Sequence, residues 1–180
     1  MKIIPTKLKD LVVIQPGVFE DARGYFFESY NKEVFHKHGI TTEFVQDNQS
    51  LSQKGVLRGL HFQNHPHAQA KLVRVITGSV LDVAVDIRKG SATYGQYFAE
   101  ILSSANKNML YVPVGFAHGF LVLEDNTIFS YKCSNVYHKE SEDGILWCDP
   151  DLNINWGIMN PSLSEKDKVS QKFKDFVTKF

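Results

Sequence analysis

Residues 59–78 read GLHFQNHPHAQAKLVRVITG, and they raise the question of whether the protein binds a metal ion. His65 and His67 are two positions apart, so both imidazoles would point the same way from a β-strand and could ligate zinc or iron. Lys71 opposes such a site, because an ammonium close to a metal ion is repelled by several kcal/mol even at an effective dielectric constant of about 20. Pro66 also lacks the N–H that strand pairing requires. We therefore expect HPH to form a surface turn.

The composition fits one globular domain over residues 1–180. Hydrophobic residues make up 43% and charged residues 22%, which argues against disorder and membrane residence. The 20 basic and 20 acidic residues balance, which argues against nucleic acid as a partner, although a local basic patch can bind an anion. Cys133 and Cys148 form neither a zinc knuckle nor a disulfide framework and favour a reduced, cytoplasmic setting. The N-terminal apolar run is too short for a signal peptide or a membrane span.

Most of the chain between residues 11 and 156 has the pattern of short strands. These segments are rich in Val, Ile, Phe and Tyr and are separated by Gly, Asn, Asp or Ser. They cover residues 11–19, 24–30, 55–62, 71–78, 79–88, 95–102, 108–115, 117–124 and 126–137. The pattern predicts an all-β protein.

Helix is indicated in two places. Residues 31–38 give a weak signal, and the C-terminal residues 164–180 give a stronger one. In the second segment Ser164 and Asp167 resemble a capping box. A helix there would carry four apolar residues on one face, namely Val169, Phe173, Phe176 and Val177. We therefore expect short helices and a C-terminal helix beside the strands.

The strand at residues 79–88 should have two different faces, because alternate side chains point opposite ways. One face would carry Leu81, Val83, Val85 and Ile87, and it suits the gap between two sheets or an oligomer surface. The other would carry Val80, Asp82, Ala84 and Asp86, and it suits a lumen with polar partners. Lys71 could share that lumen with Asp82, since a buried ammonium needs a carboxylate or a ligand charge. Alternatively, Lys71 extends to water from a strand end.

The opening stretch also resembles the first motif of the cupin superfamily. Gly59, His65, His67 and Gly78 match that motif, while Lys71 stands where an acidic residue is expected. Residues 113–118, PVGFAH, match the second motif and end in His118. The resemblance implies a double-stranded β-helix, that is, a cupin-like jelly roll. It also leaves open a metal-dependent cupin oxygenase or isomerase that would use His65, His67 and His118.

Nearly the whole chain resembles the dTDP-4-dehydrorhamnose 3,5-epimerase family. The matching segments are 20–28, 44–50, 58–63, 69–88, 112–120, 131–156 and 163–167, in order and at compatible spacing. The resemblance implies a homodimer with exchanged strands that uses no metal or other cofactor and inverts C3 and C5 of a dTDP-linked 4-keto-6-deoxyhexose. Inversion of C3 alone, another nucleotide-linked 4-keto sugar, and a non-catalytic sugar-nucleotide binding module are the alternatives.

The resemblance also implies the catalytic roles. His61 would be the base that removes the proton α to the carbonyl, Lys71 would stabilise the enolate oxygen, and Tyr131 would return a proton. Tyr137 is a second phenol that spacing does not exclude. Asp167 would orient His61, although it could instead serve only the capping box. Taken alone, the GLHF context of His61 is also that of a core histidine.

The same resemblance implies a set of substrate contacts. Arg23, Arg58 and Lys166 would meet the pyrophosphate. Further contacts to base, ribose or phosphates would come from Glu28, Gln46, Asp47, Asn48 and Glu142. Phe19 and Phe26 would stack on the base unless they are core residues, and Asp82 with His118 would form a second buried polar pair near the sugar. Gln49 replaces the histidine that the family often has in QDNHS.

Overall fold

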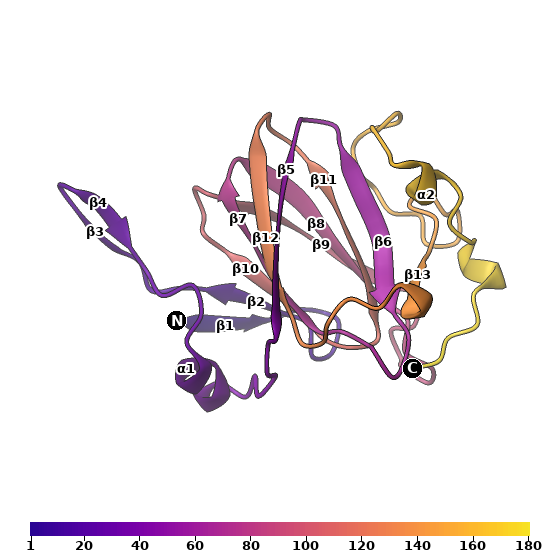
Figure 1. Ribbon diagram of the computed structural model, residues 1–180, viewed down its shortest axis with the longest axis horizontal. Coiled ribbons are helices and arrows are strands. Elements are labelled where there is room, and N and C mark those ends of the chain that lie inside the picture. The colour runs from indigo at the N-terminus through magenta and orange to yellow at the C-terminus, as the bar shows by residue number, and fades with distance from the viewer.

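Two antiparallel sheets face each other in the computed structural model, which describes residues 1–180 (Figure 1). The six-stranded sheet has the order β1-β2-β10-β7-β12-β5, and the five-stranded sheet has the order β13-β6-β11-β8-β9. The first sheet comprises β1 (Lys2–Pro5), β2 (Val12–Gln15), β10 (Met109–Val112), β7 (Lys71–Thr77), β12 (Thr127–Cys133) and β5 (Gln46–Ser52). The second comprises β13 (Glu142–Gly144), β6 (Leu57–Gln63), β11 (Phe116–Val122), β8 (Ser79–Asp86) and β9 (Tyr97–Ser103). The all-β jelly-roll prediction is confirmed.

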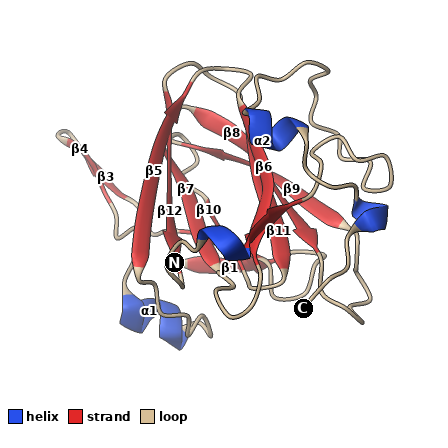
Figure 2. Cartoon of the chain, turned by 45° about the vertical axis from the view of Figure 1, so that its right-hand side comes forward, coloured by secondary structure: helices blue, strands red, loops and turns tan.

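A separate hairpin of β3 (Phe19–Asp21) and β4 (Gly24–Phe26) projects away from the two sheets (Figure 1). The helical segments are α1 (Lys32–Lys37), α2 (Glu165–Lys168), and the short 3₁₀ turns η1 (Lys139–Ser141) and η2 (Phe173–Asp175). These helical segments lie on the outside of the two sheets, as Figure 2 shows. The predicted helix near residues 31–38 is confirmed as α1. Asn31 begins it by accepting a hydrogen bond from the Val34 amide at 3.3 Å.

The interior between the sheets is largely apolar, with a few buried polar side chains among the apolar ones. Val73 and Val75 of β7 pack with Val80 and Ala84 of β8, as the alternation of both strands predicts. Phe129 of β12 joins the same cluster. Asp82, which shares a face of β8 with Val80 and Ala84, is buried there too. The predicted lumen face of β8 is therefore confirmed.

The opposite face of β8 lies elsewhere than expected. Val83, Val85 and Ile87 point away from the other sheet, into a second apolar cluster that includes Trp156 and Phe176. The C-terminal part of the same chain covers them (Figure 1). This face of the strand thus lies neither between the sheets nor on an oligomer surface. Alternation identified it as apolar, but it carries no information about which segment covers it.

The expected C-terminal helix is only one turn long. α2 begins at Ser164 as predicted, but it ends at Lys168, and the chain then makes hydrogen bonds to other segments. The Leu146 amide donates to the Gln171 carbonyl at 2.8 Å, and the Lys89 amide donates to the Phe180 carbonyl at 2.7 Å. These bonds compete with a continuing helix.

The apolar face predicted for that helix is also wrong. Val169 and Val177 are 80% and 81% exposed, whereas Phe176 is buried against Phe62 with ring centroids 5.3 Å apart. Phe173 is half-buried. The segment follows the barrel wall in an extended path, so only some of its apolar side chains reach that wall.

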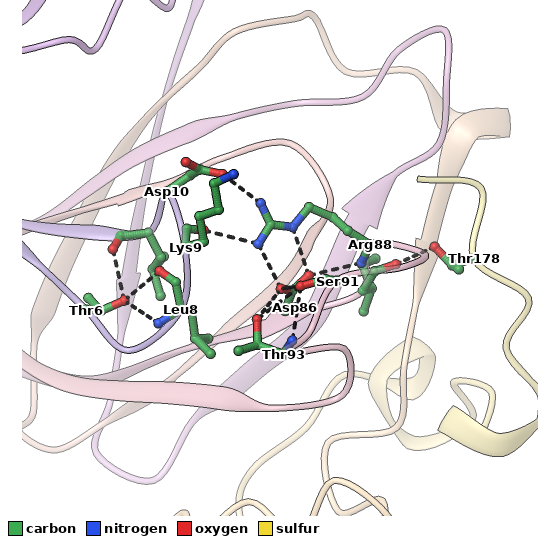
Figure 3. Close-up of polar contacts among 11 residues, drawn as sticks. Thr6, Leu8, Lys9, Asp10, Asp86, Arg88, Ser91, Thr93 and Thr178 are labelled. Atoms are coloured by element: carbon green, nitrogen blue, oxygen red, sulfur yellow. Dashed lines mark hydrogen bonds and ion pairs between the residues drawn. The ribbon is translucent and has the colours of Figure 1, made fainter.

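A buried carboxylate holds the β8–β9 loop and, through Arg88, connects it to the β1–β2 loop (Figure 3). Asp86, at the end of β8, accepts hydrogen bonds from the Arg88 guanidinium at 2.8 and 2.9 Å, from Ser91 at 2.6 Å and from Thr93 at 2.7 Å. Arg88 also donates to Asp10 at 2.9 Å, which connects the β1–β2 loop to this cluster. Burial raises the pKa of Asp86, but these hydrogen bonds outweigh it and lower the pKa to about 2.

This depressed pKa predicts a loss of stability in acid. A carboxyl with a lower pKa in the folded than in the unfolded state stabilises the fold above the unfolded pKa, and its contribution, about 2 kcal/mol, is lost as pH falls from about 4 to about 2. Asp86→Asn should therefore lower the free energy of unfolding by about 3 kcal/mol at pH 7, since it leaves Arg88 without its buried partner. The difference in the free energy of unfolding between Asp86→Asn and wild type should shrink as the pH falls toward 2.5. Urea titrations across this pH range provide the measurement.

The matched control is Asp151→Asn, because Asp151 is exposed and its carboxylate makes no hydrogen bond. The free energy of unfolding of Asp151→Asn should differ from that of wild type by the same amount at every pH. Parallel curves for Asp86→Asn and wild type would contradict the assignment.

Candidate active site

A cavity of about 400 Å³ opens between the two sheets. His61 of β6 and His118 of β11 face it from the five-stranded sheet, and Lys71 of β7 and Tyr131 of β12 face it from the six-stranded sheet. Asp167 of α2 closes one side. The structure therefore brings together the four predicted catalytic side chains, which come from distant parts of the sequence.

His61 is hydrogen-bonded to Asp167. Its Nε2 atom lies 2.5 Å from Asp167 Oδ1, and the carboxylate is buried while the imidazole is half-buried. Asp167 Oδ2 accepts a separate hydrogen bond from the Ser164 hydroxyl at 2.7 Å, while the Asp167 amide donates to Ser164 Oγ at 3.2 Å. The capping box and the pairing with His61 thus use different atoms and do not compete.

This arrangement lowers the pKa of Asp167 and selects one tautomer of His61. Burial raises the pKa of Asp167, but the hydrogen bonds from His61 and Ser164 outweigh it and hold the pKa below its ordinary value. A carboxylate facing Nε2 favours the tautomer with the proton on that nitrogen. Neutral His61 then carries its free lone pair on Nδ1, which is the atom that can act as a base.

Lys71 is half-buried in the cavity and makes no side-chain hydrogen bond or direct ion pair. Burial lowers its pKa, whereas the more distant Asp82 and Glu142 carboxylates and the neighbouring Cys133 oppose that shift. Lys71 lies on the same face of β7 as Val73 and Val75, which pack between the sheets. Asp82 is buried in the same space, so the expectation that the two share the lumen is confirmed. An ammonium without a direct partner suits a ligand that carries or develops negative charge.

His118 and Asp82 form the second buried pair. His118 Nε2 lies 2.9 and 3.0 Å from the two Asp82 carboxylate oxygens, and both residues are buried. The register of β8 and β11 places Asp82 opposite Phe120 and Ala84 opposite His118. Only His118 lines the cavity, so Asp82 acts on the site through the imidazole.

The two candidate phenols have different surroundings. Tyr131 lines the cavity with His61 and Lys71, and burial raises its pKa. Tyr137 is 55% exposed, lies outside the cavity lining, and donates its hydroxyl to Glu142 at 2.9 Å. The geometry therefore groups Tyr131, rather than Tyr137, with His61 and Lys71.

Of the remaining predicted substrate contacts, Arg58 lines the cavity, whereas Gln46, Asn48, Glu142 and Lys166 lie outside its lining. Arg58 donates to the Ser52 hydroxyl at 3.2 Å and has no carboxylate partner. Glu142 makes an ion pair with Lys166. On β5, Gln46 donates to Asn48 at 3.1 Å.

Two other predicted contacts point elsewhere. Asp47 alternates with Gln46 and Asn48 along β5, is exposed, and is held by Lys132 at 2.9 Å. Glu28 is exposed between the hairpin and α1, where it accepts a hydrogen bond from Asn31 at 3.0 Å. Neither residue lines the cavity of its own chain.

The three predicted contacts from the N-terminal hairpin are also outside this cavity. Phe19 and Phe26 are 71% and 67% exposed, so they are not core residues. Arg23, at the tip of the hairpin, forms an ion pair with Asp21 at 2.5 Å. Figure 1 shows the hairpin directed away from the barrel.

The HPH sequence forms the predicted turn between β6 and β7. His67 stacks on His138 with ring centroids 3.6 Å apart, and His65 lies beside Phe180. His118 is bonded to Asp82 in the barrel, so these three histidines do not form one site. No group of three or more His, Cys, Asp or Glu side chains is arranged to hold a metal ion.

Some cavity residues were not predicted as site residues. Ser50 lines the cavity from β5, and its hydroxyl is buried without a hydrogen-bond partner. It is two positions from Asn48, so strand alternation starting from Asn48 could have identified it. Ser162 and Leu163 also line the cavity, but they follow an irregular segment that has no periodic signal.

The comparison with known proteins agrees with this geometry. The family model described as dTDP-4-dehydrorhamnose 3,5-epimerase matches residues 5–175. The chain belongs to the dTDP-4-dehydrorhamnose 3,5-epimerase family. A relative of that name from Shigella flexneri is 53% identical, and the alignment covers 97% of each chain.

Solved structures of this family superpose on the whole fold. The dTDP-4-dehydrorhamnose 3,5-epimerase of Elizabethkingia anophelis is 53% identical, with a TM-score of 0.93 and 97% of each chain covered. The dTDP-6-deoxy-D-glucose-3,5-epimerase RmlC of Legionella pneumophila, in complex with dTDP-4-keto-L-rhamnose, is 47% identical, with a TM-score of 0.94 and 98% and 94% covered. None of the helices in the present structure has the length and apolar composition that a membrane crossing requires.

The Ser164–Asp167 hydrogen bond can be tested directly. Ser164→Ala removes a donor to the ionised carboxylate, so the pKa of Asp167 should rise toward its ordinary value, and loss of the cap should reduce stability by about 1 kcal/mol. The carboxyl carbon of Asp167 can be followed by NMR during a pH titration. Ser170→Ala is the control, because Ser170 bonds only the Lys166 carbonyl. An unchanged Asp167 titration in Ser164→Ala would contradict the described hydrogen bond.

Proposed function

We propose that the protein inverts C3 and C5 of dTDP-4-dehydro-6-deoxy-D-glucose and forms dTDP-4-dehydro-L-rhamnose. One observation carries the proposal. His61, paired with Asp167, shares a cavity with the ammonium of Lys71 and the phenol of Tyr131. Membership of the epimerase family and the relative solved with dTDP-4-keto-L-rhamnose support the choice of substrate.

The reaction begins with removal of a proton. C3 and C5 of this sugar are both adjacent to the C4 carbonyl, so loss of either proton gives an enolate. The Nδ1 atom of His61 takes the proton, and the Asp167 carboxylate stabilises the imidazolium that forms. Lys71 supplies the positive charge for the enolate oxygen. A fixed charge of this kind contributes several kcal/mol to transition-state stabilisation.

Inversion requires that the proton return from the other side. His61 belongs to β6 and Tyr131 to β12, and these strands are in the two facing sheets. The two groups therefore approach a sugar bound between the sheets from opposite walls. The raised pKa of Tyr131 keeps its phenol protonated at neutral pH, so it can donate to the carbanion carbon.

Deuterium incorporation tests the chemistry. In deuterated water the wild-type product should carry label at both C3 and C5, observed by NMR. His61→Asn should reduce exchange at both carbons by about 10²- to 10⁴-fold, since it removes the base. Tyr131→Phe should reduce product formation, while Tyr137→Phe, its matched control, should have a smaller effect. Label at C3 alone would indicate a C3 epimerase, and label at neither carbon would contradict the proposal.

We infer that a second copy of the chain completes the nucleotide part of the site. Arg58 has no carboxylate partner and is available to a pyrophosphate from within the cavity. Phe19, Arg23 and Phe26 reach away from their own cavity. We infer a homodimer in which each hairpin enters the cavity of the partner and contacts the nucleotide.

A cytoplasmic location stays a prediction.

Subunit mixing tests this arrangement. A His61→Asn chain has an intact hairpin, and an Arg23→Ala/Phe26→Ala chain has an intact His61. After joint unfolding and refolding, half of the dimers should be mixed, each with one complete site, and about a quarter of wild-type activity should return. If each hairpin serves its own cavity, mixing restores nothing, and the dimeric arrangement is wrong.

A further inference from the structure

The β3–β4 hairpin has two chemically different faces. Phe19 pairs with Phe26 across the two strands, and Glu20 pairs with Tyr25. Neighbouring residues of a strand point to opposite faces, so the two phenylalanines share one face, while Glu20 and Tyr25 share the other. The phenylalanine face is largely exposed. Tyr25 on the other face is 55% exposed, but this face has contacts with the chain's own barrel.

Lys107 makes the first of these contacts. Its ammonium lies 4.3 Å from the centre of the Tyr25 ring and 4.0 Å from the Glu20 carboxylate. Lys107 belongs to the turn between β9 and β10, and its side chain is only 13% exposed. Asn106 fixes that turn by accepting hydrogen bonds from the Ser103 and Asn108 amides at 3.0 Å. The cation is thus supplied by an ordered turn.

Arg74 makes the second contact. Its guanidinium carbon lies 5.8 Å from the centre of the Phe27 ring, and Phe27 is 6.0 Å from the Tyr25 ring. Arg74 is on β7 and forms no ion pair with a carboxylate. Two cations of the barrel therefore lie against Tyr25 in the middle of the hairpin and Phe27 just after it.

A hairpin of two three-residue strands is too short to hold its own direction in water. Its orientation must come from contacts with the rest of the molecule, and Lys107 and Arg74 supply them. We propose that Lys107, assisted by Arg74, is a positioning residue for substrate binding. It fixes the angle at which the hairpin leaves the barrel, so that Arg23 and the phenylalanine face arrive preorganised at the partner's cavity. This inference rests on the dimeric arrangement proposed above.

The proposal predicts an effect on substrate binding without an effect on chemistry. Lys107 lies outside the cavity lining, so its replacement leaves His61, Lys71 and Tyr131 in place. A less ordered hairpin reduces the fraction of binding-competent molecules, and apparent affinity falls by that fraction. Lys107→Met should therefore raise KM about 5- to 30-fold, the range that a partly desolvated cation–π contact represents, with kcat unchanged.

Two further lysine variants isolate the cation. Lys107→Arg should restore KM to within about twofold of wild type, because a guanidinium also binds the face of an aromatic ring. Lys107 has a backbone φ of 56°, and Lys, Met and Arg bear the same cost of that conformation, so the comparison isolates the charge. Lys54→Met removes an exposed lysine that makes no ion pair and should leave KM unchanged.

A double-mutant cycle tests the contact itself. If Lys107 acts through the Tyr25 ring, Tyr25→Leu should raise KM as well, and the Lys107→Met/Tyr25→Leu protein should be little worse than either single variant. Thermal unfolding of each variant shows whether it is folded. Additive effects on KM would overturn the assigned contact.

The outcomes separate this inference from the proposed dimer. If subunit mixing restores activity while Lys107→Met leaves KM unchanged, or lowers kcat in parallel with stability, the positioning role is wrong and the dimer stands. If mixing restores nothing, the dimeric arrangement fails and the positioning role fails with it. Restored activity on mixing together with a raised KM, unchanged kcat and rescue by Lys107→Arg supports both.

Discussion

A charge inside a barrel is stable only when a partner is buried with it, and the buried carboxylates of this fold follow that constraint. Asp82 is buried with His118, Asp167 with His61, and Asp86 with Arg88. Each carboxylate makes direct hydrogen bonds to its cation or imidazole. Lys71 is different, because it faces the cavity with no direct partner. The structure therefore leaves the Lys71 ammonium incompletely neutralised where the proposed reaction develops an enolate.

The pairs also explain why the site is assembled from both sheets and from α2. β7, β8 and β11 each contribute only one or two inward polar side chains, since the others on that face belong to the apolar core. The base and its proposed counterpart, the Tyr131 phenol, therefore come from opposite sheets. In the proposed reaction, a sugar held between these two walls would lose a proton to one wall and receive a proton from the other. The hydrogen bond from Ser164 then fixes the carboxylate that orients the base.

Much of the barrel could be predicted from alternation, because one face of each strand must be apolar. The lumen positions of Lys71 and Asp82 follow from alternation. The HPH turn was predicted from Pro66. The resemblance to the family, rather than any periodicity, identified His61, which in GLHF looks like a core residue. β5 was missed because its residues are polar on both faces, one toward the cavity and the other toward solvent.

Other failures arose where tertiary contacts override local preference. Residues 169–180 have a helical pattern, but their backbone groups bond to residues 89 and 146 instead. The cover over Val83 and Val85 comes from a segment remote in sequence. Phe19 and Phe26 could be assigned as aromatic contacts but not placed, because strand pattern does not reveal that a hairpin leaves its own barrel. Asp47 was assigned with its neighbours, although alternation turns it to the opposite face.

The position of Asp167 near the end of the chain has a consequence for synthesis. A nascent chain emerges from the ribosome with its N-terminus first, and its N-terminal parts generally begin to fold first. All the strands that surround the cavity emerge before α2 does, so a nascent barrel contains His61 without the carboxylate that orients it. The pair is completed only when α2 docks. A polypeptide still being translated, or one truncated before residue 167, would lack the carboxylate that is hydrogen-bonded to His61.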